Sequence, residues 1–164
     1  MTLPEIRVSV LVPAKDEAEN LPLFMEQVEA AFRGFSPGFE VIVVDDGSED
    51  DSWAVLEGLR ARYPFLRAVR HRARRGIADA LRTGYLNARG DVLVFYPADL
   101  QFKPADIPRL VAPILADEAD MVTGFKEGKY EKAFVSSVYN KLSRVLFHVP
   151  VKDLNSVKAY RREI

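Results

Sequence analysis

The chain has 164 residues, no cysteine and a formal net charge of −1. This length suffices for one domain with a hydrophobic core, and the absence of cysteine excludes disulfides and thiolate metal sites. No run approaches the roughly 18 apolar residues of a membrane-spanning helix, and the N-terminus lacks the basic and apolar regions of a secretory signal. We therefore expect a soluble, cytoplasmic protein.

Short runs of β-branched residues alternate along the chain with segments of helical spacing. The runs predict strands over residues 8–14, 39–46, 66–71, 91–99, 120–125 and 155–162. The spacing predicts helices over residues 21–33, 52–62, 77–88, 105–116 and 133–149. Strands that are apolar on both faces and separated by helices are typical of a parallel sheet covered on each side. The sequence therefore predicts a single α/β domain over residues 1–164, with a doubly wound, mostly parallel sheet.

Polar residues cluster directly after the predicted strands. The first strand ends in PAKDEAEN, the second in DDGSEDDS, the fourth in PADLQ and the fifth in GFKEGK. Ligands of doubly wound sheets bind at this carboxyl edge of the strands. The pattern G-x-G-x-x-G is missing after the first strand, which counts against a nicotinamide or flavin site, and the P-loop pattern is missing too.

Two pairs of polar residues at this edge indicate different tasks. Asp99 and Gln101 are expected to alternate along an extended backbone, where their oxygens could hold a divalent metal, Mg²⁺ or Mn²⁺, that is shared with a diphosphate. The alternative is an ordinary turn or helix N-cap. Asp45 and Asp46 end a buried strand, where one carboxylate can accept hydrogen bonds from a nucleobase or ribose. Capping of the helix that begins near Ser52 is the alternative for acids in this loop.

Charge is unevenly distributed along the chain. Nine arginines and a single acid, Asp79, lie between Arg60 and Arg89, whereas residues 45–51 are dominated by acids. Such separate clusters suggest an anionic ligand and a cation close to one another, and solvated helix faces are the alternative for each arginine taken singly. We expect no nucleic-acid partner.

Several motifs together carry a resemblance to a known family. They are VSVLVPAKDEAENL, EVIVVDDGSEDDS, RRGIADALRTGYLNARGDVLVF, ADLQFKPADIPRL, DMVTGFK, VSSVYNKLSR and DLNSVKAYRRE. In this order and spacing, the chain resembles the catalytic domain of family 2 glycosyltransferases of the GT-A fold. It is most similar to the branch of dolichol- and polyprenyl-phosphate mannose or glucose synthases. A phospho-receiver domain is also a small doubly wound unit, but it needs its acid pair after the first strand, where this chain has PAKDE.

The resemblance implies a binding site for a nucleotide-diphosphate sugar, linked to GDP or UDP. The nucleotide-binding residues that it implies are Pro13, Ala14, Glu17, Asp45, Asp46, Arg75 and Ala98. It implies Asp99 and Gln101 as metal ligands, and Asp99 and Asp153 as catalytic residues. Pro97 departs from the family pattern because it stands where the first aspartate of the D-x-D-x-Q run is usual. Ala78 likewise replaces the second glycine of the family's R-G-L-G loop.

The resemblance also implies a polyprenyl phosphate as the acceptor. Lys126, Lys132 and Ser136 stand where the similar synthases place the arginines and the serine that hold the acceptor phosphate. A phosphate is already an anionic nucleophile, whereas a saccharide hydroxyl needs a base, and Asp153 is the candidate for that role. Two alternatives therefore stay open: a glycosyltransferase that acts on a hydroxyl, and a degenerate or truncated domain that binds nucleotide sugars without activity.

The segment 133–149 has two interpretations. Its apolar residues repeat at helical spacing and its cations lie off that stripe, as in a core-facing helix or in one that rests at a lipid interface. A lipid acceptor favours peripheral association with the cytoplasmic face of a membrane. Compared with the family, the chain also ends early, so we expect its acceptor part to be incomplete. The oligomeric state stays open.

Overall fold

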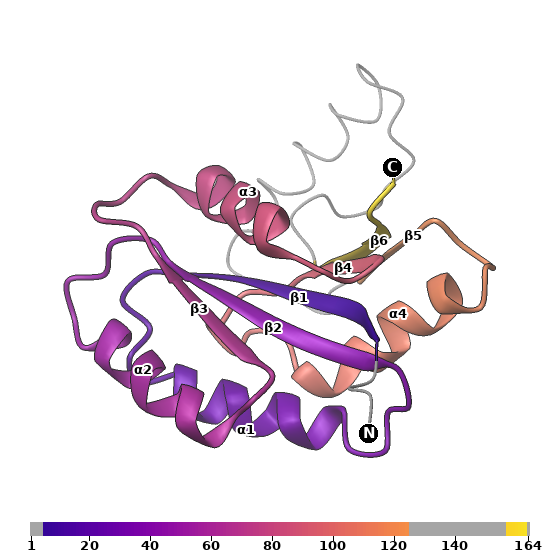
Figure 1. Ribbon diagram of the computed structural model, residues 1–164, viewed down its shortest axis with the longest axis horizontal. Coiled ribbons are helices and arrows are strands. Elements are labelled where there is room, and N and C mark those ends of the chain that lie inside the picture. The colour runs from indigo at the N-terminus through magenta and orange to yellow at the C-terminus, as the bar shows by residue number, and fades with distance from the viewer. Residues whose placement is uncertain (1–4, 125–156, 164) are drawn as a thin grey trace, which may run out of the picture.

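The described elements alternate between strands and helices. The computed structural model of the chain describes residues 5–124 and 157–163. The strands are β1 (Ile6–Ala14), β2 (Gly38–Asp45), β3 (Leu66–Arg70), β4 (Val92–Phe95), β5 (Met121–Thr123) and β6 (Lys158–Arg161). The helices are α1 (Leu21–Ala31), α2 (Ser52–Arg62), α3 (Ile77–Asn87) and α4 (Ile107–Leu115), with a 3₁₀ turn η1 (Pro104–Asp106) before α4. Figure 1 shows their arrangement.

The strands form a six-stranded sheet in the order β3-β2-β1-β4-β6-β5. β1 pairs in parallel with both β2 and β4, and β2 pairs in parallel with β3. β6 lies between β4 and β5 and is antiparallel to both. The prediction of a doubly wound, mostly parallel α/β sheet is therefore confirmed, with β6 as its antiparallel strand.

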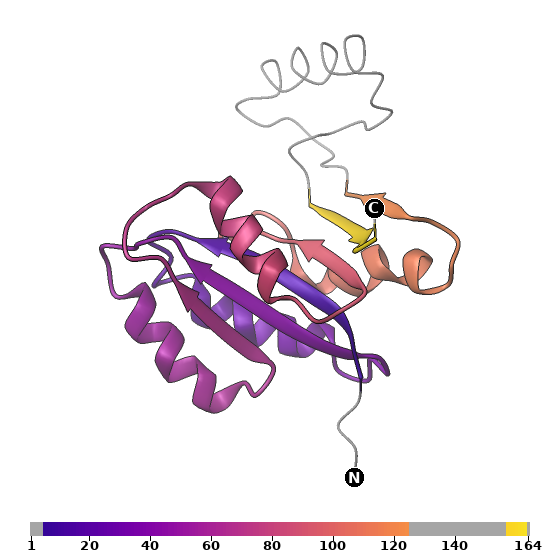
Figure 2. The same cartoon turned by 45° about the horizontal axis from the view of Figure 1, so that its top comes forward.

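Helices cover both faces of the sheet, as Figures 1 and 2 show. Val8, Val10 and Val12 of β1 belong to the larger core cluster, which also holds buried residues of α1, α2 and α4. Leu11 points to the other face and packs in a smaller cluster with Ala80 of α3. Because β1 is buried on both faces, it reads as a nearly continuous apolar run rather than an alternating one.

Several predicted boundaries differ from the structure, and two of these differences concern the region around and after the end of β4. The strand predicted over 91–99 ends at Phe95, although the N–H of Tyr96 still donates to Leu11 O at 3.0 Å. Pro97 follows, and since proline has no N–H to donate, it cannot extend the ladder. The helix predicted over 105–116 is split into η1 and α4. The helix predicted over 133–149 lies outside the described residues.

A buried carboxylate fixes the amino edge of the sheet. Glu40, near the start of β2, is 1% exposed and accepts from Ser9 Oγ at 2.8 Å. It also accepts from the backbone N–H of Arg89 at 2.8 Å, and the guanidinium groups of Arg89 and Arg67 contact its second oxygen. Ser9 Oγ in turn accepts from Gly90 N at 2.9 Å. Glu40 therefore ties the loop before β4 to β1 and β2.

Within the described residues, no helix has both the length and the apolar character needed to cross a bilayer.

Candidate nucleotide-binding edge

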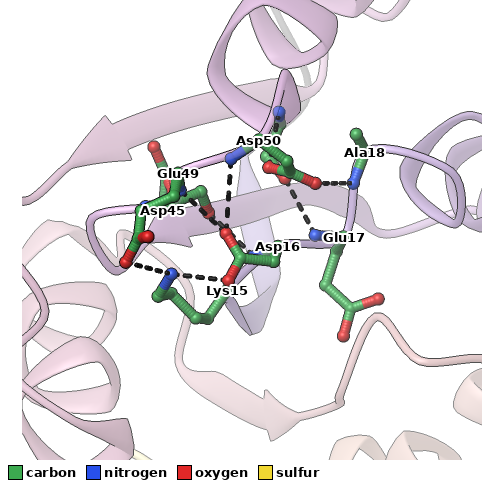
Figure 3. A network of polar contacts seen from close by, with 9 residues as sticks. Lys15, Asp16, Glu17, Ala18, Asp45, Glu49 and Asp50 are labelled. Carbon is green, nitrogen blue, oxygen red and sulfur yellow. Dashed lines mark hydrogen bonds and ion pairs between the residues drawn. The ribbon is translucent and has the colours of Figure 1, made fainter.

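The loops at the carboxyl edge of β1 and β2 are bound to each other (Figure 3). Asp16, with a φ of 56°, accepts from the backbone N–H of Glu49 at 2.8 Å. Its own N–H donates to Ser48 Oγ at 2.9 Å, and Ala18 N donates to Asp50 Oδ2 at 3.1 Å. These acids satisfy backbone donors of the neighbouring loop. The two loops are thereby held in one arrangement at the edge of the sheet.

Two further contacts tie Glu17 into this network. Its backbone N–H donates to Ser52 Oγ at 2.8 Å, at the first residue of α2. Its side chain accepts from Asn20 Nδ2 at 2.6 Å. Glu17 was predicted to bind the nucleotide, and the structure places it in the β1–α1 loop, half-buried, beside the acids of the β2–α2 loop. Its contact with a nucleotide stays a prediction.

Asp45 is fully enclosed by protein. Its Oδ1 accepts from Ser48 N at 2.9 Å. Its Oδ2 lies 3.2 Å from Arg70 Nε, close enough for an ion pair but misaligned for a hydrogen bond, so this buried oxygen lacks a hydrogen-bond donor among the described residues. The Arg70 guanidinium also lies 5.4 Å from the ring centroid of Trp53. The predicted contact of Asp45 with a nucleobase stays a prediction, and it requires that the carboxylate become accessible.

Asp46 turns toward the loop between β3 and α3. Oδ1 accepts from His71 Nδ1 and from Arg75 N, both at 2.8 Å, and Oδ2 accepts from Gly76 N at 2.7 Å. Burial alone would raise the pKa of Asp46, but the hydrogen bonds from His71 and the two backbone N–H groups outweigh it and hold this pKa below its ordinary value. Asp46 is therefore an ionised anchor for this loop at neutral pH.

A cavity of about 190 Å³ opens between these loops at the carboxyl edge. Its lining consists of Pro13, Ala14, Lys15, Asp46, Arg74, Gly76, Ile77, Ala80 and Pro97. This volume is below the roughly 300 Å³ at which sites for whole ligands begin, so it suits one ring or phosphate group of a larger molecule. Pro13, Ala14 and Asp46 were all predicted to bind the nucleotide, and the structure brings them together here.

Two other predicted nucleotide-binding residues lie apart from this lining. Arg75 is exposed, and its side chain pairs with Asp79 one turn along α3 at 3.6 Å. Ala98 is 1% exposed and belongs to the larger core cluster. Their roles in nucleotide binding stay predictions.

The backbone around Asp99 is a turn, so the expectation of an extended run with alternating side chains is wrong. Asp99 Oδ1 accepts from Gln101 N at 3.1 Å, and Leu100 between them has a φ of 58°. The turn follows because the strand has already ended before Pro97. The buried Tyr96 closes this loop, since its hydroxyl donates to Lys103 O at 2.7 Å.

This turn leaves two oxygens for a metal. Asp99 Oδ2 has no hydrogen bond or ion pair within the described residues, and Gln101 is exposed at the rim of a second cavity of about 780 Å³. That cavity is also lined by Tyr96, Phe102, Lys103, Asp106, Arg109, Leu110, Val122, Gly124 and Val157. No group of three or more His, Asp or Glu in the described ranges could hold a metal by itself. The residues therefore fit a metal only if a diphosphate supplies further ligands.

The predicted acceptor residues cannot be placed. Lys126, Lys132, Ser136 and Asp153 lie outside the described residues.

Sequence reasoning missed His71 and Thr83. The two side chains are 12 residues apart in the chain, and their contact depends on how α3 packs against β2. The local signal was limited to a histidine at the end of a strand, which occurs in many cores.

The chain matches a known family over most of its length. The family model described as Glycosyl transferase family 2 matches residues 9–149. An undecaprenyl-phosphate 4-deoxy-4-formamido-L-arabinose transferase of Klebsiella pneumoniae is 31% identical over 171 aligned residues, which cover 100% of this chain and 52% of that protein. A dolichol-phosphate mannosyltransferase of Pyrococcus furiosus is 34% identical, over 84% of this chain and 38% of that protein. The chain thus spans about half the length, or less, of these curated relatives.

Solved structures are similar in fold. A glucosyl-3-phosphoglycerate synthase of Mycobacterium tuberculosis, solved with Mn²⁺, UDP and glucosyl-3-phosphoglycerate, has a TM-score of 0.72 and 25% identity, over 96% of this chain and 57% of that one. A mannosyltransferase of Pyrobaculum calidifontis, solved with GDP-mannose and Mn²⁺, has a TM-score of 0.67 and 28% identity, over 98% of this chain and 47% of that one. The predicted GT-A fold is confirmed by these likenesses.

Proposed function

The chain belongs to glycosyl transferase family 2, and we propose that it transfers a sugar from a UDP- or GDP-linked donor to a polyprenyl phosphate. The chain spans about half the length of its curated relatives, and the proposal concerns the activity of the whole protein. The observation that carries it is the cavity at the carboxyl edge, where Pro13, Ala14 and Asp46 meet Pro97, two residues before Asp99 in the chain.

We propose that the nucleotide binds to the loops that follow β1, β2 and β3, which are held in place by hydrogen bonds to one another. Pro13 and Ala14 end β1 inside the lining, and Asp46 holds the opposite wall through Arg75 N and Gly76 N. A loop that is already fixed pays less ordering entropy when the nucleotide binds, which favours affinity. Arg74 lines the same cavity and brings positive charge to a diphosphate, whereas Lys15, also in the lining, is paired with Asp16 and Glu49.

Asp99 and Gln101 are proposed to hold the divalent metal, Mg²⁺ or Mn²⁺, together with the diphosphate. When bound, such an ion stabilises the negative charge that develops on the leaving diphosphate. Pro97 offers no ligand where the family's first aspartate is usual. Asp99 Oδ2, which has no hydrogen bond or ion pair among the described residues, is therefore the carboxylate oxygen on which metal binding at this turn depends.

A phosphate acceptor suits the groups that the chain offers. The second pKa of a phosphate monoester is about 6, so a polyprenyl phosphate is largely a dianion at neutral pH and needs no base. Lys126, Lys132 and Ser136 are proposed to bind it. The names of the relatives support this acceptor, since they are an undecaprenyl-phosphate and a dolichol-phosphate transferase. Peripheral association with the cytoplasmic face of a membrane belongs to the same proposal.

Calorimetry with UDP and GDP, each with and without Mn²⁺, tests the donor site. We expect one nucleotide to bind more tightly with Mn²⁺, and Asp99→Asn to abolish that enhancement while the melting temperature stays nearly unchanged. Asp91→Asn is the matched control, because Asp91 is an exposed acid that precedes β4, at the opposite end of that strand from the Asp99 turn. Metal-enhanced binding that survives in Asp99→Asn would refute the metal assignment.

A binding domain without activity is the second candidate, and Pro97 at the cavity wall is the observation that favours it. A tight nucleotide complex that never transfers or hydrolyses its sugar, in the presence of Mn²⁺ and polyprenyl phosphate, would support that candidate.

A further inference from the structure

A buried histidine connects the candidate donor site to α3. His71 follows β3 and is 6% exposed. Its Nδ1 lies 2.8 Å from Asp46 Oδ1, and its Nε2 lies 2.9 Å from Thr83 Oγ1. Its backbone N–H donates to Asp45 O at 2.9 Å. Both ring nitrogens and the main chain are therefore engaged.

The partners determine how the ring is protonated. An ionised carboxylate can only accept, so Nδ1 must carry a proton and donate it to Asp46. Nε2 can then accept from the Thr83 hydroxyl or, if protonated, donate to it. Thr83 lies on α3, which packs on β1 and β2. The ring is thus held from the helix side and directed at the Asp46 carboxylate.

Asp46 connects His71 to the loop that forms one wall of the cavity. The same carboxylate binds the backbone N–H groups of Arg75 and Gly76, and Gly76 is in the lining with a φ of 95°. The loop also lies directly on Gly47, where an added Cβ would be 2.6 Å from Arg74 N. The loop is therefore confined on one side by Gly47 and held on the other by the Asp46 oxygens, so its position depends on the direction in which these oxygens point.

We propose that His71 is a positioning residue for donor binding. It orients Asp46, which sets the position of residues 74–76 at the nucleotide cavity, and this role rests on the proposed function. The contact satisfies a buried donor of His71, but it is made to the same carboxylate that binds the N–H groups of Arg75 and Gly76. The effect of its loss should therefore reach the loop amides and the nucleotide, beyond any effect on global stability.

Two amide variants separate the two ring nitrogens. In His71→Asn the side-chain amide lies near the Nδ1 position and can still donate to Asp46, whereas in His71→Gln it reaches toward Thr83 and leaves Asp46 without that donor. His71→Ala removes both contacts. Tyr63→Phe is the control, because Tyr63 is a fully buried residue of the larger core whose hydroxyl lacks a hydrogen-bond partner among the described residues.

Amide hydrogen exchange and calorimetry on the 164-residue chain provide the readouts. Loss of a hydrogen bond to a charged group changes an equilibrium constant by about tenfold or more. We therefore expect His71→Ala and His71→Gln to speed exchange at Arg75 N and Gly76 N, and to weaken nucleotide binding in the presence of Mn²⁺, each by about tenfold. His71→Asn and the control should stay within about threefold of the wild type in both measurements.

The outcomes distinguish this role from the proposed function. Equal exchange at the two loop amides in the Asn and Gln variants, or equal nucleotide affinity in both, would overturn the positioning role while the wild type still binds. The Asn and Gln pair decides the matter even if the Ala variant does not fold. A wild type that binds neither UDP nor GDP with Mn²⁺ contradicts the proposed function, and the positioning role with it.

Discussion

Replacement of Glu40 by alanine should destabilise the fold by about 3 kcal/mol. The Ser9 hydroxyl and the Arg89 N–H would lose their acceptor in a place closed to water, and each such loss costs about 1–3 kcal/mol. The side chains of Arg67 and Arg89 are 37% and 59% exposed and can turn to solvent, so their ion pairs add only about 0–1 kcal/mol. Glu40→Gln keeps one acceptor oxygen and should lose roughly half as much.

Urea unfolding followed by circular dichroism measures this difference. For a chain of this size, a loss of about 3 kcal/mol corresponds to a fall of about 6–12 °C in melting temperature. Glu57→Gln is the matched control, because Glu57 is exposed on α2 and has no hydrogen bond or ion pair in the described part of the chain. Nucleotide affinity should stay unchanged in folded Glu40→Ala, since Glu40 lies at the edge of the sheet opposite the cavity.

The pH dependence of this difference is a second test of the same reasoning. Burial would raise the pKa of Glu40, but the hydrogen bonds from Arg89, Ser9 and Arg67 outweigh it and lower this pKa below the ordinary value of 4.5. The stabilisation is therefore fully present above pH 4.5 and is lost as the pH falls through the lowered pKa. A difference between wild type and Glu40→Ala below about 1 kcal/mol at pH 7, or one that grows as the pH falls from 4.5, would refute the argument.

Four further substitutions follow from the structure. Gly47→Ala should destabilise the fold by about 2 kcal/mol or more and weaken nucleotide binding, because the added Cβ would strike the β3–α3 loop. Gly58→Ala, which has open space around it on α2, should instead stabilise the fold by about 0.5–1 kcal/mol, and equal melting temperatures of the two variants would contradict this. Tyr63→Phe should leave stability unchanged or raise it by up to about 1 kcal/mol in urea unfolding, since it removes a buried hydroxyl that has no hydrogen-bond partner among the described residues, and a clear loss would contradict that. Pro97→Asp should strengthen the Mn²⁺ dependence of nucleotide binding in calorimetry, because it adds a carboxylate at the cavity wall, and an unaltered dependence would show that this position does not reach the metal.

The sheet was predictable because its strands are buried on both faces. Runs such as residues 10–14 and 41–44 are continuously apolar, and this pattern is a property of the local sequence. The direction of β6 could not be predicted, since a short strand has the same sequence pattern whether it pairs in parallel or antiparallel. The end of β4 at Phe95 could have been predicted from Pro97, whose missing N–H stops the ladder.

The candidate site was predictable in outline for a topological reason. Parallel strands deliver their carboxyl ends to one edge, so Ala14, Asp46 and Pro97 had to meet there. The different contacts of Asp45 and Asp46 could not be predicted from two adjacent acids in the sequence. It depends on the direction of each side chain and on partners far away in the chain, Arg70 for one and His71 for the other.

Sugar transfer to a lipid phosphate tests the account most directly. The whole protein would be incubated with Mn²⁺, a short-chain polyprenyl phosphate and radiolabelled UDP- or GDP-sugars, and the organic phase would be analysed for labelled polyprenyl phosphate sugar. The account predicts label in that product, and its loss in Asp99→Asn. Label that appears only on a saccharide acceptor would contradict the proposed acceptor. A whole protein that binds the donor but transfers to neither acceptor would contradict the proposed activity.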